Sequence, residues 1–369
     1  MKAETGQVKL KTALALCART AQSGGVLPVL SHVLLETTDE GRLRLTATNM
    51  AVTVEITIAA QVEDAGALTV PASLFRELVA GMEPERATLS APEDKPTLAV
   101  VCGGRRVTIQ GLTADAMPPV PEPENAREIT FPEGVLPGAL KFASMGAATT
   151  NDRPVLTGVS MRSTGDALTL AGANGFVVAV ATLDVPGTDG LNIILPPGLL
   201  PLIATMGGEI RMTVDERLAV FECEEMRVTA LLIRGTFPNF MRFLATDDIS
   251  RFLEINRDGF LDAVNAAVPV ARDGSGMLRL QESEGGLVLS CSAPNIADFE
   301  TMIDCGASMP EGDVTPFGVM LNVQYLKEML SAMNTPKVKM GGIGPSAPVL
   351  FSEPGRQCVI MPMFRAGTP

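Results

Sequence analysis

Hydrophobic residues along the chain follow two patterns, and the pair of patterns occurs three times. Apolar residues four positions apart open each repeat and predict an amphipathic helix, at Leu10 and Leu14, at Leu136 and Leu140, and at Phe260 and Val264. Alternation of apolar and polar residues follows, as in RLRLTAT, ALTLAGA and GLVLSCS, and predicts half-buried antiparallel strands. A second helical segment closes each repeat, in PASLFRELVAGM, PPGLLPLIATM and NVQYLKEMLSAM.

Short motifs keep the same spacing as the helices. Pro28-Val29-Leu30 recurs as Pro154-Val155-Leu156, and LRLTATN recurs as LTLAGAN and, more loosely, as LVLSCSA. A constant spacing of about 125 residues indicates that one structural unit was copied. We predict an α+β fold of three tandem repeats, each with two helices packed on antiparallel sheets. The boundaries are expected in the proline-rich Met117–Ala126 and the polar Ala245–Ser250, which gives domains at 1–122, 126–245 and 250–369.

The composition limits the possible functions. A chain of 369 residues and 38.8 kDa is long enough for two or three cores. It has no Trp and one Tyr, so strong stacking on single-stranded nucleic acid is not expected. The net charge of −13 restricts DNA contacts to local patches, although a closed ring would retain DNA topologically.

Cysteine and histidine usage indicates an intracellular protein without a metal. The six cysteines include no C-x-x-C pair and the single histidine is His32, so we expect no cofactor, no metal and a cytoplasmic location. The apolar stretch Leu191–Met206 contains three prolines and fails as a membrane span. The segment Lys9–Cys17 faintly resembles a lipoprotein signal, but its apolar run is short and Leu16 stands where a small residue is expected, which favours an amphipathic helix.

Several further segments keep a characteristic order and spacing between Met1 and Arg365: LPVLSHVLLE, LRLTATN, DRPVLTGV, LIRGTFPNF, NVQYL and VIMPMFR. Together they resemble the bacterial DNA polymerase III beta subunit family, the beta sliding clamps. The resemblance implies a non-catalytic processivity subunit, two copies of which join head to tail in a six-unit ring. It implies as partners a second copy of the chain, encircled duplex DNA of any sequence, and the replicative polymerase, clamp loader and other clients that bind through short peptides.

The resemblance also assigns residues to three sites. The peptide groove takes apolar residues from the second and third repeats: Leu156, Ala173, Gly175, Phe176, Val177, Val178, Tyr325, Pro348, Val359, Met361, Pro362, Met363 and Phe364. The DNA contacts are Arg153 and, less specifically, Lys9, Lys11, Lys141, Arg272 and Lys327, for which a solvated helix face is the alternative. The dimer interface sets Val107 and Ile109 against Val268 and Pro269, and Arg105 and Arg106 against Asp298 and Glu300, although Arg105 and Arg106 also fit a solvated strand end.

The sequence departs from the family at the groove. Asn174-Gly175-Phe176-Val177 stands in place of the usual Asp-Gly-His-Arg, and Met363-Phe364-Arg365, followed by four residues, replaces Met-Arg-Leu. We therefore expect a more hydrophobic groove with an altered client preference. This expectation keeps open a specialised paralogue, such as a mobile-element or resistance copy, beside a general replication clamp.

Neutral residues occupy several positions where the family often has basic ones. Val26, Ser73 and Pro197-Gly198 are examples, and they predict a looser grip on DNA. An enzyme is disfavoured because the chain has no phosphate-binding G-x-x-x-x-G-K-[ST], no G-x-S-x-G and no histidine pair. His32 is expected to be a packed strand residue and not a general base.

Overall fold

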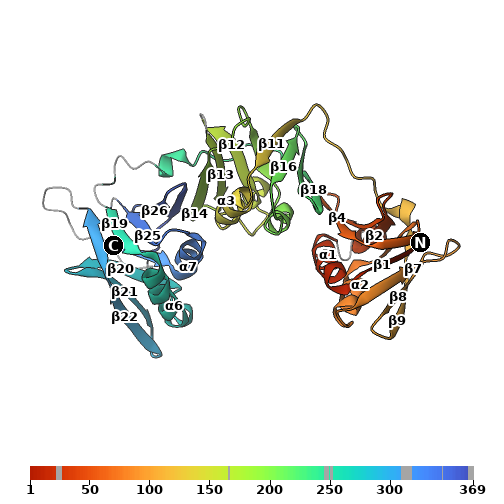
Figure 1. Cartoon of the computed structure of the whole chain (residues 1–369). Helices are drawn as coiled ribbons and strands as arrows, with labels where there is room; N and C mark the ends of the chain where they lie inside the picture. The colour runs from red at the N-terminus through yellow and green to blue at the C-terminus, as the bar shows by residue number, and fades with distance from the viewer. Residues whose placement is uncertain are drawn as a thin grey trace. The chain divides into compact units, whose positions relative to one another are not determined.

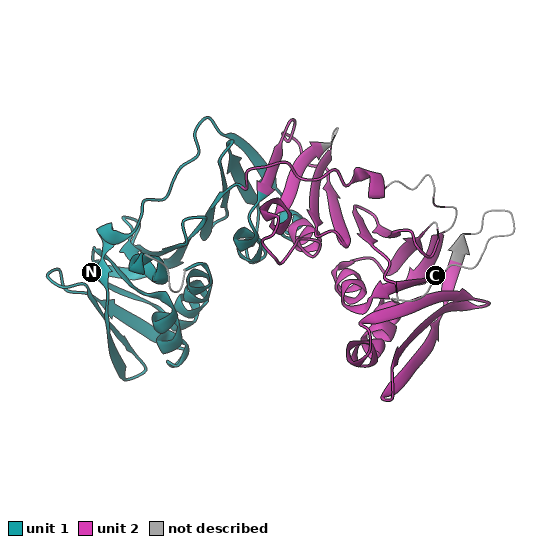
Figure 2. Ribbon diagram, turned by 180° about the vertical axis from the view of Figure 1, so that it is seen from behind, with its two compact units in different colours: residues 1–137, 195–232 teal, residues 138–194, 233–369 magenta. Residues whose placement is uncertain are grey.

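The computed structural model describes residues 1–21, 27–164, 167–244, 249, 252–308, 318–342 and 344–364. They form two compact units, 1–137 with 195–232 and 138–194 with 233–369 (Figure 2). Val26, Arg365 and most of the predicted boundary at 245–250 lie outside the described residues.

Unit 1 contains two sheets whose paired strands run antiparallel. The five-stranded sheet is ordered β5 (Gln61–Asp64), β1 (Lys2–Gly6), β7 (Arg86–Ser90), β8 (Thr97–Cys102) and β9 (Arg105–Gln110). The nine-stranded sheet is ordered β10 (Leu112–Thr113), β6 (Ala67–Pro71), β2 (His32–Thr37), β3 (Arg42–Thr48), β4 (Val52–Ala59), β18 (Met226–Leu231), β17 (Leu218–Glu222), β16 (Ile210–Val214) and β11 (Arg127–Phe131). The helices and 3-10 turns are α1 (Gln7–Thr20), α2 (Ala72–Ala80), α5 (Leu200–Ile203), η1 (Pro28–Ser31), η2 (Ala114–Ala116) and η3 (Pro197–Leu199).

Unit 2 is built in the same manner. Its nine-stranded sheet is ordered β15 (Asn192–Leu195), β12 (Val159–Thr164), β13 (Ala167–Ala173), β14 (Val177–Leu183), β27 (Arg356–Ile360), β26 (Val349–Glu353), β25 (Lys337–Gly341), β19 (Phe252–Asn256) and β23 (Cys305–Ser308). The four-stranded sheet is ordered β22 (Ala297–Ile303), β21 (Gly286–Ala293), β20 (Met277–Ser283) and β24 (Gly318–Asn322). The helices and turns are α4 (Pro154–Thr157), α6 (Arg257–Asp273), α7 (Val323–Ala332) and η4 (Met241–Phe243), and α3 (Val135–Ser144) crosses the boundary between the units.

Continuous sheets explain why the two units do not coincide with three repeats. Strand β4 of the first repeat pairs with β18 of the second, and β14 of the second pairs with β27 of the third. Contacts are therefore dense across each junction between repeats. The second repeat is divided between the units, because each of its outer strands belongs to a neighbour's sheet.

The helices bury the residues that the four-residue spacing selected. Leu10 and Leu14 of α1 and Phe260 and Val264 of α6 are fully buried. In Figure 1, α1 lies beside α2 and α6 beside α7, and α1 packs on β3 and β4. The second helix of the middle repeat is a single turn, α5, because Pro201 lacks the amide hydrogen that a longer helix would need.

Asparagine side chains begin the two helices of the third repeat. Asn256 Oδ1 accepts a hydrogen bond from Gly259 N at 2.9 Å at the start of α6. Asn322 Oδ1 accepts from Gln324 N at 2.9 Å and from Tyr325 N at 3.3 Å at the start of α7. These caps satisfy amide groups that have no partner within the first helical turn.

Candidate functional site

An apolar cavity of about 310 Å³ lies in unit 2, where the sheet strands of the second and third repeats meet. Its floor is a row of directly paired residues, Ala173 on β13, Val178 on β14 and Val359 on β27. Because directly opposite residues of antiparallel strands point to the same face, the three side chains form one continuous apolar surface. The remaining lining residues are Arg153, Leu156, Gly175, Phe176, Pro238, Asn239, Phe240, Arg242, Phe243 and Met361.

A tight turn between β13 and β14 carries the most exposed aromatic residue of the cavity. Asn174 Oδ1 accepts hydrogen bonds from Phe176 N at 2.9 Å and Val177 N at 2.8 Å, and Gly175 has a φ of 91°, which favours glycine. The Phe176 side chain is 61% exposed. The Phe176 carbonyl accepts from Met361 N at 2.8 Å, so the turn is joined to the segment that follows β27.

The linker after β18 forms the opposite wall. Phe240 is 2% exposed and packs with Ala171, Val180, Leu350 and Val359 in one cluster of the sheet face. Phe237 meets Phe240 edge to face, with ring centroids 6.1 Å apart. The Arg242 guanidinium lies 4.7 Å from the ring centroid of Phe243, which holds a cation at the cavity rim. Aromatic packing therefore makes this linker part of the site.

Seven predicted groove residues line the cavity, namely Leu156, Ala173, Gly175, Phe176, Val178, Val359 and Met361. The Val177 side chain is 3% exposed, because strand alternation turns it into the core while Val178 faces the cavity. Six predicted residues do not line this cavity: Val177, Tyr325, Pro348, Pro362, Met363 and Phe364. Phe364 is 62% exposed, and Met363 N donates to Met320 O of β24 at 2.8 Å.

Five lining residues of the linker were missed: Pro238, Asn239, Phe240, Arg242 and Phe243. Their sequence, PNFMRF, has aromatic residues three apart and no strand alternation, so it resembles an ordinary connection. Arg153, predicted as a DNA contact, lies at the rim of the same cavity, just before α4. Among the described residues, the charged ones that line the cavity are thus both arginines, Arg153 and Arg242.

Six of the eight predicted dimer residues lie on two different sheet edges, and the other two, Val268 and Pro269, lie on α6. Strand β9 is an edge of the five-stranded sheet in unit 1, and β22 is an edge of the four-stranded sheet in unit 2. Arg106, Asp298 and Glu300 are exposed, and Arg105 is exposed but donates a hydrogen bond to Gly81 O. Within the described part of the chain, each edge offers backbone groups for pairing with another strand.

The apolar residues predicted at that interface are not all accessible. Ile109 is 3% exposed, so its side chain belongs to the core of unit 1, whereas Val107 of the same strand is half-buried. On α6, Val268 is half-buried and Pro269 is exposed. Because of the alternation along β9, the Val107 side chain is accessible at the edge, whereas the Ile109 side chain is buried in the core.

The predicted DNA-contacting lysines and arginines lie mainly on helices. Lys11 on α1, Lys141 on α3 and Arg272 on α6 are exposed, whereas Lys327 on α7 is half-buried. Arg272 Nε lies 3.0 Å from Asp273 Oδ1. A partner on the adjacent residue reduces the net charge that Arg272 presents to a phosphate.

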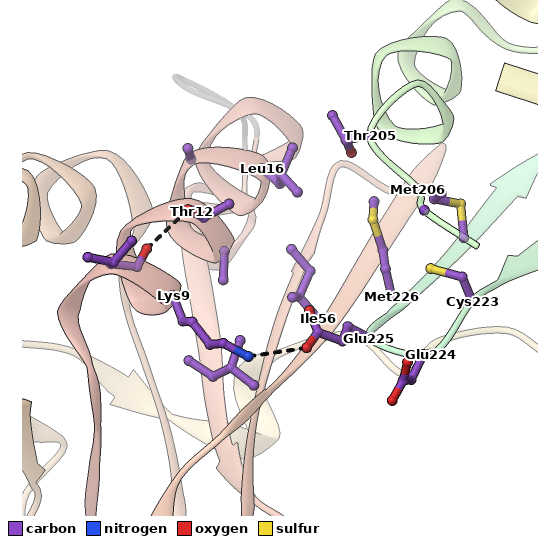
Figure 3. Close-up of a pocket in the computed structure, with 15 residues that line it drawn as sticks. Lys9, Thr12, Leu16, Ile56, Thr205, Met206, Cys223, Glu224, Glu225 and Met226 are labelled. Carbon is purple, nitrogen blue, oxygen red and sulfur yellow. Dashed lines mark hydrogen bonds and ion pairs between the residues drawn. The ribbon is translucent and has the colours of Figure 1, made fainter. Parts of the chain in front are cut away.

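Lys9 lies at a second cavity, of about 500 Å³, within unit 1. Figure 3 shows Lys9 extending from α1 toward Glu225 in the turn before β18, and Lys9 Nζ lies 3.4 Å from Glu225 Oε1. Leu16, Ile56 and Met226 form part of its apolar lining. Both partners of the ion pair are more than half exposed, so the pair is weak and water or another anion can replace it.

His32 and the cysteines form no site in the described structure. His32, 9% exposed on β2, lies 3.0 Å from Thr69 Oγ1 through Nδ1, and burial lowers its pKa. No disulfide joins the six cysteines, all of which the structure describes. Among the described residues, no group of three His, Cys, Asp or Glu side chains is placed to hold a metal ion, and no helix is long and apolar enough to cross a membrane.

Known proteins match the chain over nearly its whole length. A curated relative named "Beta sliding clamp", from Synechocystis, is 26% identical and the match covers 96% of each chain. The crystal structure of the DNA polymerase III beta subunit from Thermotoga maritima has a TM-score of 0.87 at 17% identity and covers 99% of this chain and 100% of that one. A sliding clamp from Bartonella birtlesii, solved bound to griselimycin, has a TM-score of 0.86 at 22% identity over 99% and 100%.

Three family models match successive parts of the chain. They are the N-terminal, central and C-terminal domains of the DNA polymerase III beta subunit, at residues 1–121, 131–239 and 246–364. The predicted α+β fold with three tandem clamp repeats is therefore confirmed. With all three domain models matched in order, this chain belongs to the DNA polymerase III beta subunit family.

Proposed function

We propose that the protein is a DNA sliding clamp, a cytoplasmic processivity subunit without catalytic activity of its own. Two copies join head to tail into a ring around duplex DNA, and the domains extend over 1–122, 126–245 and 250–369. The observation that carries the proposal is the presence in each chain of two different sheet edges, β9 and β22, beside three clamp repeats.

The charges on the two edges support a head-to-tail contact. Arg105 and Arg106 on β9 are basic, whereas Asp298 and Glu300 on β22 are acidic. An edge therefore repels its own copy and attracts the other edge, which favours a heterologous contact over a symmetric one. Met302, 56% exposed on β22, and the half-buried Val107 add apolar area to the contact.

Retention on DNA tests enclosure directly. The purified full-length protein, loaded by an ordinary bacterial clamp loader, should stay on nicked circular DNA in high salt and leave linear DNA by sliding off its ends. Native mass spectrometry should give twice the mass of one chain. A protein that is monomeric at micromolar concentration, or that leaves circles as fast as linear DNA, would contradict the proposal.

The edge charges provide a sharper test of the ring contact. The substitution Arg106→Glu should weaken the dimer, and Glu300→Arg in the same chain should partly restore it, because the exchanged charges attract again. Arg279→Glu, at an exposed position on β20, is a matched control that should leave the dimer mass unchanged. Equal weakening by the control would exclude pairing of these edges.

The apolar cavity of unit 2 is the proposed docking site for the replicative polymerase, the clamp loader and other clients. Its size suits one or two apolar side chains of a short peptide, and Met361 offers an adaptable thioether at its edge. Tyr325, Pro348, Pro362, Met363 and Phe364 stay predicted as further contacts of the same peptide. Griselimycin, held by the Bartonella clamp, is a suitable first ligand for this protein.

The specialised paralogue is the second candidate, and Phe176 is the observation that favours it. An exposed phenylalanine stands where the family usually has histidine, which makes the groove more apolar. We expect a consensus client peptide of an ordinary bacterial clamp to bind with altered affinity and an altered ranking of its variants. Unchanged affinity and ranking would favour the general replication clamp, and a pulldown of polymerases would identify the clients.

DNA contacts of the ring are proposed for the six cations Lys9, Lys11, Lys141, Arg153, Arg272 and Lys327. A double variant, Lys11→Ala with Lys141→Ala, should stay on nicked circular DNA for a shorter time, and its retention should depend less on salt. Arg153→Ala separates two roles, because it should reduce retention if Arg153 contacts DNA and should weaken only peptide binding if Arg153 serves the groove. Unchanged retention with an intact dimer would remove Arg153 from the DNA contacts.

A further inference from the structure

The hairpins at the two junctions between repeats share one backbone arrangement but carry different side chains. In unit 1, Cys223 and Met226 face each other across the turn between β17 and β18, and Cys223 N donates to Met226 O at 2.9 Å. In unit 2, Glu353 and Arg356 are the facing pair between β26 and β27. Met226 begins β18 beside β4, just as Arg356 begins β27 beside β14. Met226 and Arg356 therefore hold corresponding positions.

Arg356 closes the space between the hairpin and the helices of unit 2. Its Nη1 donates to the carbonyl of Ala332, at the end of α7, at 2.7 Å and lies 3.5 Å from Glu353 Oε1. Its guanidinium carbon lies 5.2 Å from the centroid of the Phe142 ring on α3. The Arg356 side chain is 15% exposed. The second junction thus seats a guanidinium between an aromatic ring of one helix, the end of another helix and the hairpin.

The same elements of unit 1 surround the cavity of about 500 Å³ (Figure 3). Leu16 lines it from α1 and holds the place of Phe142, since each follows the second buried leucine of its helix by two residues. Met206 lines it after α5, and Cys223 and Met226 line it from the hairpin. A methionine is shorter than an arginine and has no guanidinium, so the space that the arginine closes in unit 2 remains a cavity in unit 1.

The charged groups at this cavity suit a cation. Among the described residues that line it, Glu224 and Glu225 are acidic and Lys9 is basic, so the lining has one carboxylate more than it has ammonium groups. Lys9 and Glu225 are both more than half exposed, and their ion pair costs little to open. A guanidinium can bond both oxygens of a carboxylate at once, which a lysine ammonium cannot, so it would compete well for Glu225.

Apolar side chains form much of the remaining lining. Ile56, Ile58, Met206 and Met226 are mostly buried and border the cavity. Methionine side chains adapt readily to the shape of a ligand, and a cavity of this volume accommodates a small organic molecule. The apolar stem of a ligand would gain burial against these residues while its charged head stays at the partly exposed Glu225.

We propose that the cavity of unit 1 binds a small organic cation, a guanidinium on an apolar stem, with Glu225 as its charged partner and Met226 against the stem. The ligand class follows from two observations, the arginine seated in the equivalent space of unit 2 and the acidic groups at the cavity of unit 1. Every lining residue belongs to unit 1, so binding requires neither ring closure nor a client.

The half-buried Cys223 provides a readout at the cavity itself. 4-Phenylbutylguanidine is the cationic probe, and 4-phenylbutanol has the same apolar stem without a charge. Bound probe should slow the alkylation of Cys223 by iodoacetamide in the full-length protein, and the dependence on probe concentration gives a dissociation constant. Cys291 of unit 2 serves as the reference, whose alkylation should not change. We expect the guanidine to bind at least about fivefold more tightly than the alcohol.

Three variants test the residues named. Glu225→Gln should raise the dissociation constant of the guanidine by about threefold to tenfold and change that of the alcohol by less than about twofold. Glu77→Gln is the matched control, because Glu77 is likewise exposed and lies 3.3 Å from a basic partner, Arg76, but does not line the cavity. Met226→Arg gives unit 1 the residue that unit 2 has, and the probe should then no longer protect Cys223.

Wild type in which millimolar guanidine does not protect Cys223 would overturn the proposal. A guanidine that binds no more tightly than the alcohol, or an equal loss of affinity in Glu225→Gln and Glu77→Gln, would also overturn it, because the cavity would then select no charge. Glu225 is exposed, so Glu225→Gln remains a test even where Met226→Arg does not fold. None of these results would affect the proposed clamp function, because neither the two sheet edges nor the client cavity contributes a lining residue.

Discussion

Removing Arg227 should weaken the junction between the first and second repeats more than the loss of a surface ion pair would. Arg227 on β18 faces three carboxylates: Glu55 on β4 at 3.6 Å, Glu222 on β17 at 3.0 Å, and Glu122 of the linker. The Glu55 side chain is 13% exposed, and the Arg227 side chain is 28% exposed. The cluster thus ties two strands and the linker to a single guanidinium.

The magnitude follows from what the substitution Arg227→Met leaves behind. Glu55 becomes a mostly buried carboxylate without a cation, which costs about 2 kcal/mol, the middle of the range for a buried group that loses its partner. The two more exposed partners, Glu122 and Glu222, add less than about 1 kcal/mol each. We expect the free energy of opening the β4–β18 seam to fall by about 2 to 3 kcal/mol.

Hydrogen exchange followed by mass spectrometry measures this opening locally. A loss of about 2 kcal/mol corresponds to a rise of about thirtyfold in the exchange rate of seam amides. Peptides from unit 2 serve as an internal reference. Arg211→Met is the matched control, since Arg211 lies 3.5 Å from Glu222 but its side chain is 54% exposed. It should change the free energy of opening the β4–β18 seam by less than about 0.5 kcal/mol. Equal exchange in Arg227→Met and Arg211→Met would refute the reasoning.

Further predictions concern the groove turn, a helix cap and the cysteines. Asn174→Ala removes the acceptor for two backbone amides and should weaken client-peptide binding severalfold, measured by anisotropy, with Asn49→Ala as a control that removes the same two bonds from the turn before β4 in unit 1, away from the cavity. Asn322→Ala removes the cap of α7 and should lower the stability of the third repeat by about 1 kcal/mol, measured by hydrogen exchange of α7. Burial raises the pKa of the Cys17 thiol to about 12, so Cys17 should resist iodoacetamide at pH 8 while the partly exposed Cys223 reacts, as peptide mapping would show.

Repetition and periodicity were sufficient to predict the architecture. Leu10, Leu14, Phe260 and Val264 lie in the helices that their spacing predicted, and the alternating segments are antiparallel strands. Those signals are local and depend only on which face of an element is buried. The middle repeat shows the limit, because the sequence of its second helix has the apolar spacing but Pro201 restricts the helix to one turn.

The site was predicted less completely because it depends on contacts between distant segments. Strand alternation distinguishes Val177 from Val178 only once the register of β14 with β27 is known. The linker residues Phe240 and Phe243 become part of the site through packing against sheet residues far away in the sequence. Arg153 illustrates a third limit, since an exposed arginine can serve DNA or a peptide, and only its position at the cavity favours the second.

Glu55 gives the seam a pH dependence opposite to that of a typical ion-paired carboxylate. Burial raises the pKa of Glu55, an effect that outweighs the attraction of Arg227. The folded state therefore holds the Glu55 proton to higher pH than the unfolded state, and this group makes the seam less stable as pH rises through that window. Glu122 acts in the opposite sense: its hydrogen bond from Arg227 lowers its pKa, so its contribution is lost as pH falls through the lowered value.

The substitution Glu55→Gln removes the pH dependence that comes from Glu55 and keeps the one that comes from Glu122. The opening free energy of Glu55→Gln, relative to that of wild type, should therefore increase between pH 4.5 and pH 7.5, after correction for intrinsic exchange rates. Glu122→Gln is the contrasting variant, and its opening free energy relative to wild type should decrease as pH rises above the lowered pKa. A Glu55→Gln difference that shrinks with rising pH would mean that Arg227, and not burial, dominates the charge state of Glu55, and the seam would then be held by ion pairing instead of strand packing.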